Sequence, residues 1–331
     1  MKNSTIEQIA WRIKQSQNIA ITSHLRPDGD SLCTSIALCS IARNMGKRVD
    51  IINRDNTPFP FNHFPDIKSI TIGEIPSDLY DIIILLECAN VTRSGHDHID
   101  NYFKINIDHH HSNDYYADIN WVDPEAPAVA CMAYDLIKEL NVPFTPQVAN
   151  HLYCGIVSDT GSFQFSNTKA QAFEVCASLI KEGANPVKVS EQLFNNNPPE
   201  KIKLLGKVLS TLKMDKEGSI AIVTMFKDNL ESLNLQKEID TEDITTLVRS
   251  IKNVKMVLFF KEMREDTFRV SLRSKGTANS ALVAEYFKGG GHLHAAGFTV
   301  TGKYKELIQT VPKTVIELLE KSGQNDSVTE K

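Results

Sequence analysis

The sequence is poor in cysteine, in long apolar runs and in positive charge, and each shortage excludes a class of protein. Its six cysteines are scattered and form no C-x-x-C pair, so we expect no disulfide framework and a reducing, cytoplasmic compartment. No apolar stretch approaches the roughly 20 residues that span a bilayer, so we expect no membrane partner. The net charge of -5 argues against long duplex DNA as the main partner, although a short nucleotide needs only a local basic patch.

What the chain does have is ordinary globular composition and clustered histidine. Its 331 residues are too many for one ordinary core, which predicts two domains. Histidine is the commonest metal ligand and the usual acid–base group near neutral pH. Six of the 10 histidines stand in motif-like places: His24, the run His109-His110-His111, and His292 with His294.

The first half of the chain alternates short apolar runs with a helical pattern. Near-continuous apolar runs are typical of parallel strands in a sheet with helices on both faces. The predicted strands cover residues 18–24, 49–54, 80–88 and 104–110, and a helix between the first two covers 31–44. From about residue 129 to 213 the pattern becomes helical.

A second, mixed unit follows. Strands are predicted at 219–225, 255–263 and 267–274, and helices at 243–253 and 280–290. We therefore expect an α/β protein in which a parallel-sheet domain and a smaller mixed-sheet α/β domain face each other across a cleft. The expected boundaries are 1–190 for the first domain, 191–213 for a helical linker and 214–331 for the second domain.

Polar side chains stand where the first predicted strand ends. His24 follows the strand directly, and Asp28 and Asp30 follow across a tight turn set by Pro27 and Gly29. Ligands of open parallel sheets bind outside the carboxyl ends of the strands, which favours a metal site here. The alternative for an isolated Asp-Gly-Asp is a capped turn before a helix.

Two other predicted strands end in the same kinds of residue. Glu87 closes the third strand, Asp108–His111 closes the fourth, and Asp159 stands in an apolar helical segment. A buried carboxylate is costly unless it is paired or bound to metal. The alternatives are an N-cap or salt-bridged loop acid for Glu87 and a surface histidine run for the fourth strand.

Together these residues predict a site for two metal ions. Mixed carboxylate and imidazole ligands in this number suit two Mn²⁺-like ions rather than a structural zinc, which would favour cysteine. Two such ions clamp a phosphoryl group and activate a water for in-line attack. The set is His24, Asp28, Asp30, Glu87, His109 and Asp159.

These motifs resemble the DHH phosphoesterase superfamily, named for the run that stands here as Asp108-His109-His110. The C-terminal unit resembles the associated DHHA1 domain, with Ser271-Leu-Arg-Ser274 and Gly289-Gly-Gly-His-Leu-His-Ala-Ala-Gly297. The resemblance covers roughly residues 18–300, with the motifs in the family order. Within the superfamily the chain is similar to the NrnA-like, two-domain proteins that act as oligoribonucleases and as phosphatases of 3′-phosphoadenosine 5′-phosphate (pAp).

The resemblance implies a role for each residue of the first domain. His24 and Asp28 would hold one Mn²⁺, Asp30, His109 and Asp159 the other, and Glu87 would bridge both. Asp108 and His110 would lie close to the ions, where they support His109 or assist the water and the leaving group. Mg²⁺ or Co²⁺ are the expected substitutes for Mn²⁺.

Two features depart from the family pattern. Glu87 stands where Asp is more usual, and its extra methylene could change the metal spacing. His111 and His294 lie outside the pattern, so we expect them to be local or solvent-facing groups.

The resemblance also implies a phosphate-binding surface in the second domain. A glycine-rich loop lets backbone N–H groups approach an anion closely, and arginine offers phosphate a planar fork. Residues 249–275 carry eight Lys or Arg and three Asp or Glu, a local net charge of +5, although a solvated face of strands and helix could explain several of these lysines. The implied residues are Arg249, Arg273, Ser274, Gly289, Gly290, Gly291 and His292.

The expected function is Mn²⁺-dependent hydrolysis of very short RNA or DNA oligomers to mononucleotides, and of pAp to AMP. The alternatives are a phosphodiesterase of linear or cyclic dinucleotides, a family II-type inorganic pyrophosphatase and a non-catalytic nucleotide-binding regulator. No appended OB-like module or long basic track is evident, which argues against a processive exonuclease of the RecJ type. A homodimer is compatible with the resemblance.

Overall fold

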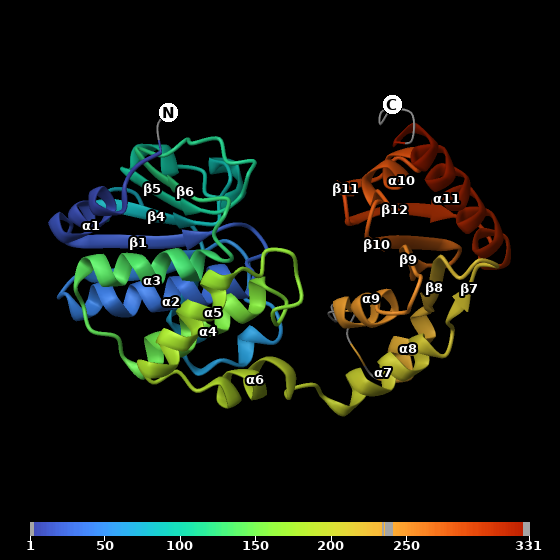
Figure 1. Cartoon of the computed structure of the whole chain (residues 1–331), viewed down its shortest axis with the longest axis horizontal. Helices are drawn as coiled ribbons and strands as arrows, with labels where there is room; N and C mark the ends of the chain where they lie inside the picture. The colour runs from blue at the N-terminus through green and yellow to red at the C-terminus, as the bar shows by residue number, and fades with distance from the viewer. Residues whose placement is uncertain (1–2, 234, 236–240, 327–331) are drawn as a thin grey trace. The chain divides into compact units, whose positions relative to one another are not determined.

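The computed structural model describes residues 3–233, 235 and 241–326, and it divides into two compact units that meet at Asn196 and Asn197. Figure 1 shows that each unit has its own sheet and its own helices. The predicted linker at 191–213 falls on the end of α6 (Pro186–Phe194) and on α7 (Pro199–Leu209). The exact boundaries at 190 and 214 stay predictions.

The first unit is built on a six-stranded sheet in the order β3-β2-β1-β4-β5-β6. All neighbouring strands run parallel, which confirms the α/β fold predicted for this part of the chain. The strands are β1 (Asn18–Ser23), β2 (Arg48–Asn53), β3 (Ile70–Ile72), β4 (Ile82–Leu86), β5 (Lys104–Asp108) and β6 (Ile119–Val122).

Both faces of this sheet are covered, because successive side chains of each strand point to opposite faces. Ile19 and Ile21 of β1 pack into a large core with the α-helices, whereas Ala20 packs on the other face with short 3₁₀ segments and loop tyrosines. The α-helices are α1 (Ile6–Gln15), α2 (Gly29–Asn44), α3 (Val129–Leu140), α4 (Pro146–Asp159), α5 (Ala170–Lys181) and α6. The 3₁₀ segments are η1 (Phe61–His63), η2 (Pro65–Ser69), η3 (Val91–Ser94) and η4 (Ile99–Asn101).

Strands β1 and β4 lie side by side at the centre of the sheet, where the order of the strands reverses. Ligand sites of open α/β sheets lie at such a reversal, beyond the carboxyl ends of the strands. Ser23 of β1 pairs with Leu86 of β4, so the next residues, His24 and Glu87, emerge beside each other. The sheet topology therefore brings two predicted metal ligands together.

Helices α2 and α4 approach closely because each carries a glycine at the contact. A Cβ atom on Gly29 would lie 2.2 Å from Ser158 Oγ, and one on Gly155 would lie 2.7 Å from Asp30 Oδ1. Any larger residue at Gly155 would displace Asp30 or separate the two helices.

The second unit has a six-stranded mixed sheet in the order β11-β12-β10-β9-β8-β7, which confirms the predicted mixed-sheet α/β domain. Only β8 and β9 pair in parallel among its described strands. Ile220 and Ile222 of β8 pack with α10 and α11, and Ala221 and Val223 pack with α7 and α9 on the opposite face. The elements after α7 are β7 (Lys213–Met214), β8 (Ile220–Met225), α8 (Lys227–Glu231), α9 (Glu242–Arg249), β9 (Met256–Arg264), β10 (Thr267–Ser274), α10 (Ser280–Tyr286), β11 (Gly290–His292), β12 (Ala295–Thr301) and α11 (Tyr304–Asp326).

Several elements differ from the sequence-based expectation. Strands β3, β6, β11 and β12 and helix α11 were not predicted, and α9 is shorter than the predicted 243–253. The predicted helix 280–290 ends at Tyr286 because Lys288 adopts a left-handed φ of 59° and the N–H of Gly289 donates back to Ala284. Within the described residues, none of the helices combines the length and the apolarity that crossing a bilayer requires.

An ion pair between a buried histidine and a half-buried aspartate joins α4 to η2. His151 Nε2 lies 2.8 Å from Asp66 Oδ2, and His151 is only 6% exposed. Burial by itself lowers the pKa of His151, but its hydrogen bonds with Asp66 and with the Cys33 thiol outweigh burial and raise this pKa to about 9.

We expect His151→Gln to remove a pH-dependent part of the free energy of unfolding. A histidine pKa that is raised on folding stabilises fully below about pH 6.5, its value in the unfolded chain, and the stabilisation is lost as pH rises through the folded value of about 9. The full effect is on the order of 3 kcal/mol. Urea unfolding across this pH window should show the wild-type advantage shrinking toward high pH, with His63→Gln, which replaces an exposed histidine of η1, as the control. A wild-type advantage that does not change with pH would contradict this account.

Candidate active site

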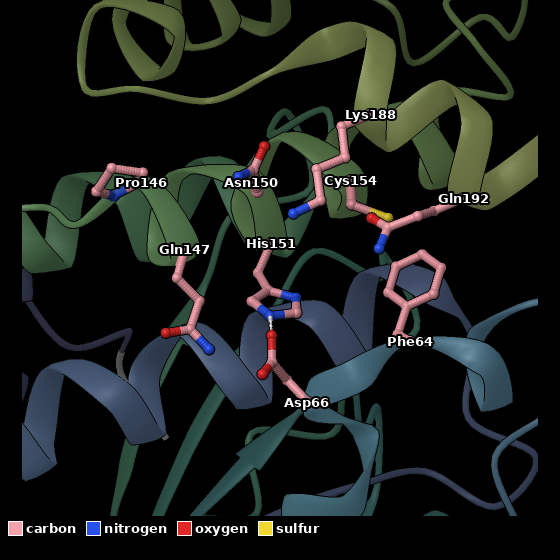
Figure 2. Close-up of a pocket in the computed structure, with 9 residues that line it drawn as sticks. All are labelled: Phe64, Asp66, Pro146, Gln147, Asn150, His151, Cys154, Lys188 and Gln192. Carbon is pink, nitrogen blue, oxygen red and sulfur yellow. Dashed lines mark hydrogen bonds and ion pairs between the residues drawn. The ribbon is translucent and has the colours of Figure 1, made fainter.

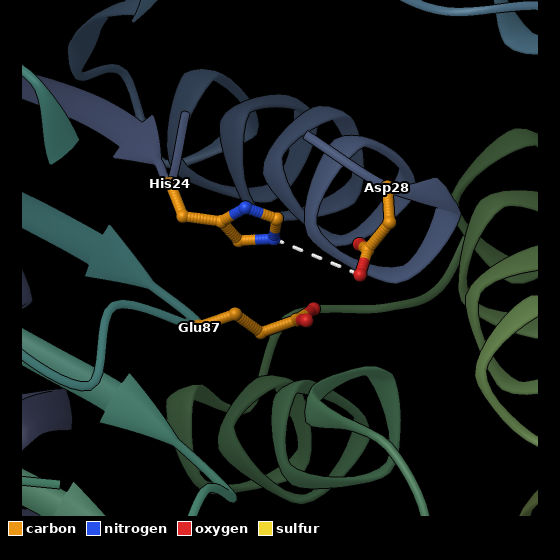
Figure 3. A group of neighbouring side chains, drawn as sticks. All are labelled: His24, Asp28 and Glu87. Carbon is orange, nitrogen blue, oxygen red and sulfur yellow. Dashed lines mark ion pairs between the residues drawn. The ribbon is translucent and has the colours of Figure 1, made fainter. Parts of the chain in front are cut away.

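Three of the predicted ligands meet beyond the carboxyl ends of β1 and β4. One ligand atom from each of His24, Asp28 and Glu87 lies within 4.8 Å of the other two. Figure 3 shows the side chains converging from the end of one strand, the start of α2 and the end of the neighbouring strand. Among the described residues, these three form the only group of three or more side chains with the spacing of metal ligands.

The imidazole of His24 presents one ring nitrogen, Nε2, to the cluster. Its Nδ1 lies 2.8 Å from the carbonyl oxygen of Leu25, a contact that assigns the proton to Nδ1 and leaves the Nε2 lone pair facing the cluster. This Nε2 is buried without a hydrogen-bond partner among the described residues, and it lies 3.6 Å from Asp28 Oδ2. A buried acceptor without a donor is costly, and a cation would satisfy it.

The Glu87 carboxylate also has a buried oxygen, Oε1, without a hydrogen-bond partner among the described residues. The residue is 1% exposed. Burial, followed by the negative charges of Asp28, Asp30 and Asp159, raises the pKa of Glu87 well above its usual range. Its backbone adopts a left-handed φ of 56°, a conformation that costs a non-glycine residue roughly 1–2 kcal/mol. A divalent cation would both fill the missing contact and allow the carboxyl to ionise.

Asp28 has two tasks. Its Oδ1 accepts the N–H of Ser31 at 3.0 Å and so caps α2, while its Oδ2 faces His24. The helix cap that was the alternative interpretation is therefore present, and it leaves one oxygen for a ligand.

A second group forms around His109 and Asp159. His109 Nε2 lies 3.8 Å from Asp159 Oδ2, and its Nδ1 lies 3.2 Å from the carbonyl oxygen of Ala126. As at His24, a backbone carbonyl accepts a hydrogen bond from Nδ1–H, and Nε2 is turned toward a carboxylate.

Asp30 is anchored at the start of α3. Its Oδ2 accepts the N–H of Val129 at 2.6 Å, and its Oδ1 accepts the N–H of Ala130 at 3.0 Å and the hydroxyl of Thr34 at 3.1 Å. Burial raises the pKa of Asp30, against the opposing effects of His109 and the α3 amides. A carboxylate offers about four lone-pair sites, so these bonds leave capacity for a cation.

Asn167 is a site residue that sequence reasoning missed. Its Nδ2 donates to Asp159 Oδ2 at 2.9 Å and to the backbone oxygens of Asp159 and Pro127. Burial and the charge of Asp30 raise the pKa of Asp159 to about 7, and the Asn167 hydrogen bond opposes that rise. The segment 126–130 thus contacts His109 through the Ala126 carbonyl and Asp30 through two N–H groups. It contacts Asp159 only through the Asn167 amide, which also donates to the Pro127 carbonyl.

Asp108 lies behind the predicted ligands. It is completely buried, and its Oδ1 accepts the N–H of His109 at 2.8 Å and the Nδ1–H of His110 at 2.7 Å. The amide of Asn113 donates to Oδ2 at 2.6 Å. Burial opposes ionisation, but these bonds and the charge of His110 hold the pKa of Asp108 below its usual value. This arrangement suits the supporting role predicted for Asp108.

In the second unit, the Ser274 side chain is hydrogen-bonded to other groups of the protein. Its hydroxyl donates to the carbonyl oxygen of Ala278 at 2.6 Å, lies 3.1 Å from His294 Nδ1, and accepts the hydroxyl of Ser280 at 3.0 Å. Ser274 therefore ties the turn after β10 to the turn between β11 and β12, and phosphate contact by its side chain stays a prediction. His294 is exposed and local, and so is His111 in the first unit.

The three glycines of the predicted phosphate loop differ in their surroundings. A Cβ on Gly289 would lie 2.2 Å from the carbonyl oxygen of Gly297, and one on Gly291, where φ is 145°, would lie 2.4 Å from Ala296 Cα. Packing against β12 alone therefore requires glycine at both positions. Gly290 has nothing within 4 Å of the place a Cβ would take, so packing does not explain it.

The remaining predicted residues of the second unit lie near the end of β10. They are Arg249, Arg273 and His292. Arg273 of β10 and His292 of β11 both pair with Ala295 of β12, one from each side. Arg249 ends α9, and its carbonyl oxygen accepts Lys275 Nζ at 3.0 Å, which holds that helix end near the end of β10. The prediction for the His292 side chain lies outside the described part of the structure.

Family comparisons match both units. The N-terminal domain of the DHH family matches residues 18–156, and the DHHA1 domain matches residues 217–321. The chain belongs to the DHH family, with a DHH domain followed by a DHHA1 domain, as its motifs predicted. Membership makes it a hydrolytic phosphoesterase.

The relatives narrow the group to NrnA-like proteins. The chain is 29% identical over 306 residues to the bifunctional oligoribonuclease and PAP phosphatase NrnA of Thermus thermophilus, covering 92% of this chain and 91% of the relative. It is 30% identical over 288 residues to the NrnA of Bacillus subtilis, covering 85% and 89%. An exopolyphosphatase-related protein from Bacteroides fragilis has a crystal structure with a TM-score of 0.83 at 25% identity, covering 94% and 95% of the two chains.

Glu87→Gln should stabilise the protein when divalent metal is removed. Without a cation, the raised pKa of Glu87 means that its carboxyl must take up a proton to be buried near neutral pH. This protonation costs free energy, and the neutral amide of Gln avoids that cost. With a chelator present, Tm should rise by roughly 2 °C or more, and the further rise that Mn²⁺ produces in the wild type should shrink. Thermal unfolding with chelator and with Mn²⁺ measures both effects, with Glu182→Gln on the exposed end of α5 as control. A Glu87→Gln protein that is less stable than the wild type in chelator would show that no cation is needed there.

Proposed function

We propose that the chain is a divalent-metal-dependent phosphohydrolase that degrades very short oligonucleotides to mononucleotides and dephosphorylates pAp to AMP. The observation that carries this proposal is the convergence of His24, Asp28 and Glu87 beyond β1 and β4, with His24 Nε2 and Glu87 Oε1 buried and unpartnered among the described residues. The approach of His109, which follows β5, to Asp159 supports it. The names of the Thermus and Bacillus relatives support the substrate class.

The donor set fits two metal ions. We assign His24 and Asp28 to one ion, Asp30, His109 and Asp159 to the other, and Glu87 to both. Oxygen and imidazole donors suit Mn²⁺, with Mg²⁺ or Co²⁺ as substitutes. When bound, two such ions supply an activated water and neutralise charge on the phosphate.

The residues of the chain orient the ligands and handle protons. Backbone carbonyls hold the Nδ1–H groups of His24 and His109, so both rings present Nε2. Asp108 holds Nδ1 of His110, whose ring is 34% exposed, so His110 can exchange a proton through Nε2 with the departing oxygen. The buried network behind Asp108 keeps that ring in one orientation.

The second unit supplies groups for the substrate phosphate. Arg273 offers a planar fork, and the open surroundings of Gly290 allow its N–H to approach an anion. Arg249 adds positive charge, and Ser274 keeps the turns around these groups in place. We also propose a cytoplasmic location, which the six buried free thiols support.

One activity panel tests the proposal. With Mn²⁺, the wild type should hydrolyse pAp, pApA and a short oligoribonucleotide, and should act poorly on a long single strand, cyclic di-AMP and pyrophosphate. Asp108→Ala and His109→Ala should each lower the rate by at least about 100-fold, because one disorients His110 and the other removes a ligand. His111→Ala, which alters the exposed neighbour of these residues, is the control and should retain activity.

The panel also separates the rival functions. Turnover of cyclic di-AMP or pApA alone would indicate a dinucleotide phosphodiesterase, and turnover of pyrophosphate alone would indicate a pyrophosphatase. Nucleotide binding without turnover would indicate a regulator. Each of these results, or unchanged turnover in Asp108→Ala and His109→Ala, overturns the proposal.

Arg273→Ala and Gly290→Ala should weaken catalysis without removing metal. Loss of the guanidinium fork, or a methyl group where the phosphate approaches, should lower kcat/KM for pAp about tenfold or more. Arg269→Ala, on the same strand but exposed, is the matched control. Steady-state kinetics together with metal analysis measure the outcome. Metal loss from Arg273→Ala, or kinetics equal to those of Arg269→Ala, would place these residues outside the substrate site.

A further inference from the structure

The first unit contains a polar pocket that shares no residue with the proposed metal site. It encloses about 340 Å³ between η2, the first half of α4 and α6 (Figure 2). His151 in this pocket precedes Asp159 by two turns of α4, about 12 Å along the helix axis. The polar residues that line it are Asp66, Gln147, Asn150, His151, Lys188 and Gln192.

One wall of the pocket holds an ion pair that is already satisfied. Asp66 is bonded to the buried His151 at 2.8 Å. The hydrogen bond from His151 lowers the pKa of Asp66, and Asp66 in turn keeps His151 protonated at neutral pH. The Asp66 carboxylate is therefore neutralised inside the wall and needs no cation from solution.

Helix α6 adds polar groups that have no such partner. Figure 2 shows Lys188 and Gln192 extending from α6 into the space in front of Cys154 and His151. In the part of the chain that the structure describes, neither the Lys188 ammonium nor the Gln192 amide makes a hydrogen bond or ion pair, and Lys188 interacts with Asp66 only at longer range. The lining thus carries two positive charges against one negative charge.

The other lining groups indicate what the uncharged part of a ligand would contact. Asn150 uses its Oδ1 to accept the N–H of Asn185 at 2.8 Å, which leaves its Nδ2 free to donate. The buried ring of Phe64 supplies an apolar wall. The volume lies at the low end of the range for small-molecule sites, roughly 300–1,000 Å³. A small molecule with one anionic group and several hydrogen-bonding groups matches this lining in charge and size.

We propose that the pocket formed by Asp66, His151, Lys188 and Gln192 binds a small organic anion, a phosphate monoester or a carboxylate, outside the active site. Lys188 pairs with the anionic group, and Gln192 and Asn150 hydrogen-bond to the body of the molecule. The ion pair of Asp66 and His151 forms the rigid wall against which the ligand lies. This site is independent of the proposed phosphohydrolase activity.

Calorimetric titration of the whole chain tests the proposal. The probes are ribose 5-phosphate, gluconate and inorganic phosphate, each with a chelator present so that binding at the metal site is removed. Lys188→Ala and Gln192→Ala change the pocket, and Lys181→Ala removes an exposed lysine from α5 as the matched control. Arg273→Ala tests for binding at the phosphate groups of the second unit. Because Lys188 is exposed, its replacement should leave Tm unchanged.

The expected result is saturable binding of ribose 5-phosphate or gluconate that weakens about tenfold in Lys188→Ala and less in Gln192→Ala. Lys181→Ala and Arg273→Ala should bind as the wild type does. Which of the two organic probes binds distinguishes a phosphate from a carboxylate ligand. The proposal is overturned if no probe binds, if Lys188→Ala binds as tightly as Lys181→Ala, if Arg273→Ala abolishes binding, or if inorganic phosphate binds as tightly as the organic probes.

Discussion

Mutual repulsion among carboxylates that gather at one edge of a parallel sheet is the constraint on which the first unit depends. Burial makes ionisation costly, and each charge makes it costlier for its neighbours, which raises the pKa values of Glu87, Asp30 and Asp159. The protein compensates this only in part. Amides of α3 hold Asp30 and Asn167 holds Asp159, but Glu87 keeps one oxygen without a donor among the described residues. We propose that cations supply the compensation that Glu87 lacks.

The fold holds this repulsive cluster together through connections that are far apart in sequence. The reversal of strand order places His24 beside Glu87, and the glycine at position 155 lets α4 pack directly on Asp30. The short segment 126–130 holds His109 and Asp30 with backbone groups, and it reaches Asp159 through the side-chain amide of Asn167. Backbone groups inside a packed core move little, so they orient the ligands more firmly than flexible side chains would. The second unit uses a similar device, since Ser274 joins two turns near Arg273 and Gly290.

Much of the fold and of the candidate site was predictable because the sequence patterns that indicate them are local. Apolar runs that end in His24, Glu87 and Asp108 indicate both the strands and the edge at which their ligands collect, and the family model of the DHH domain covers the same region. The edge strands β3, β6 and β11 were missed because runs of three or four residues show no clear alternation. Asn167 was missed because nothing in its neighbourhood connects it to Asp159 before the chain folds. The loop glycines are a mixed case, since packing accounts for glycine at positions 289 and 291 but not at position 290.

The sequence by itself determined the class of fold, seven of the strands and the residue types that could hold metal. These follow from apolar periodicity and from the chemistry of imidazole and carboxylate groups, which depend on near neighbours only. The tertiary structure decided which atoms of those residues are free. The amide that binds Asp30 lies 99 residues away at Val129, and the carboxylate that pairs with His151 lies 85 residues away at Asp66. Whether a polar atom has a partner is a property of long-range contacts, and only the packed chain brings those contacts together.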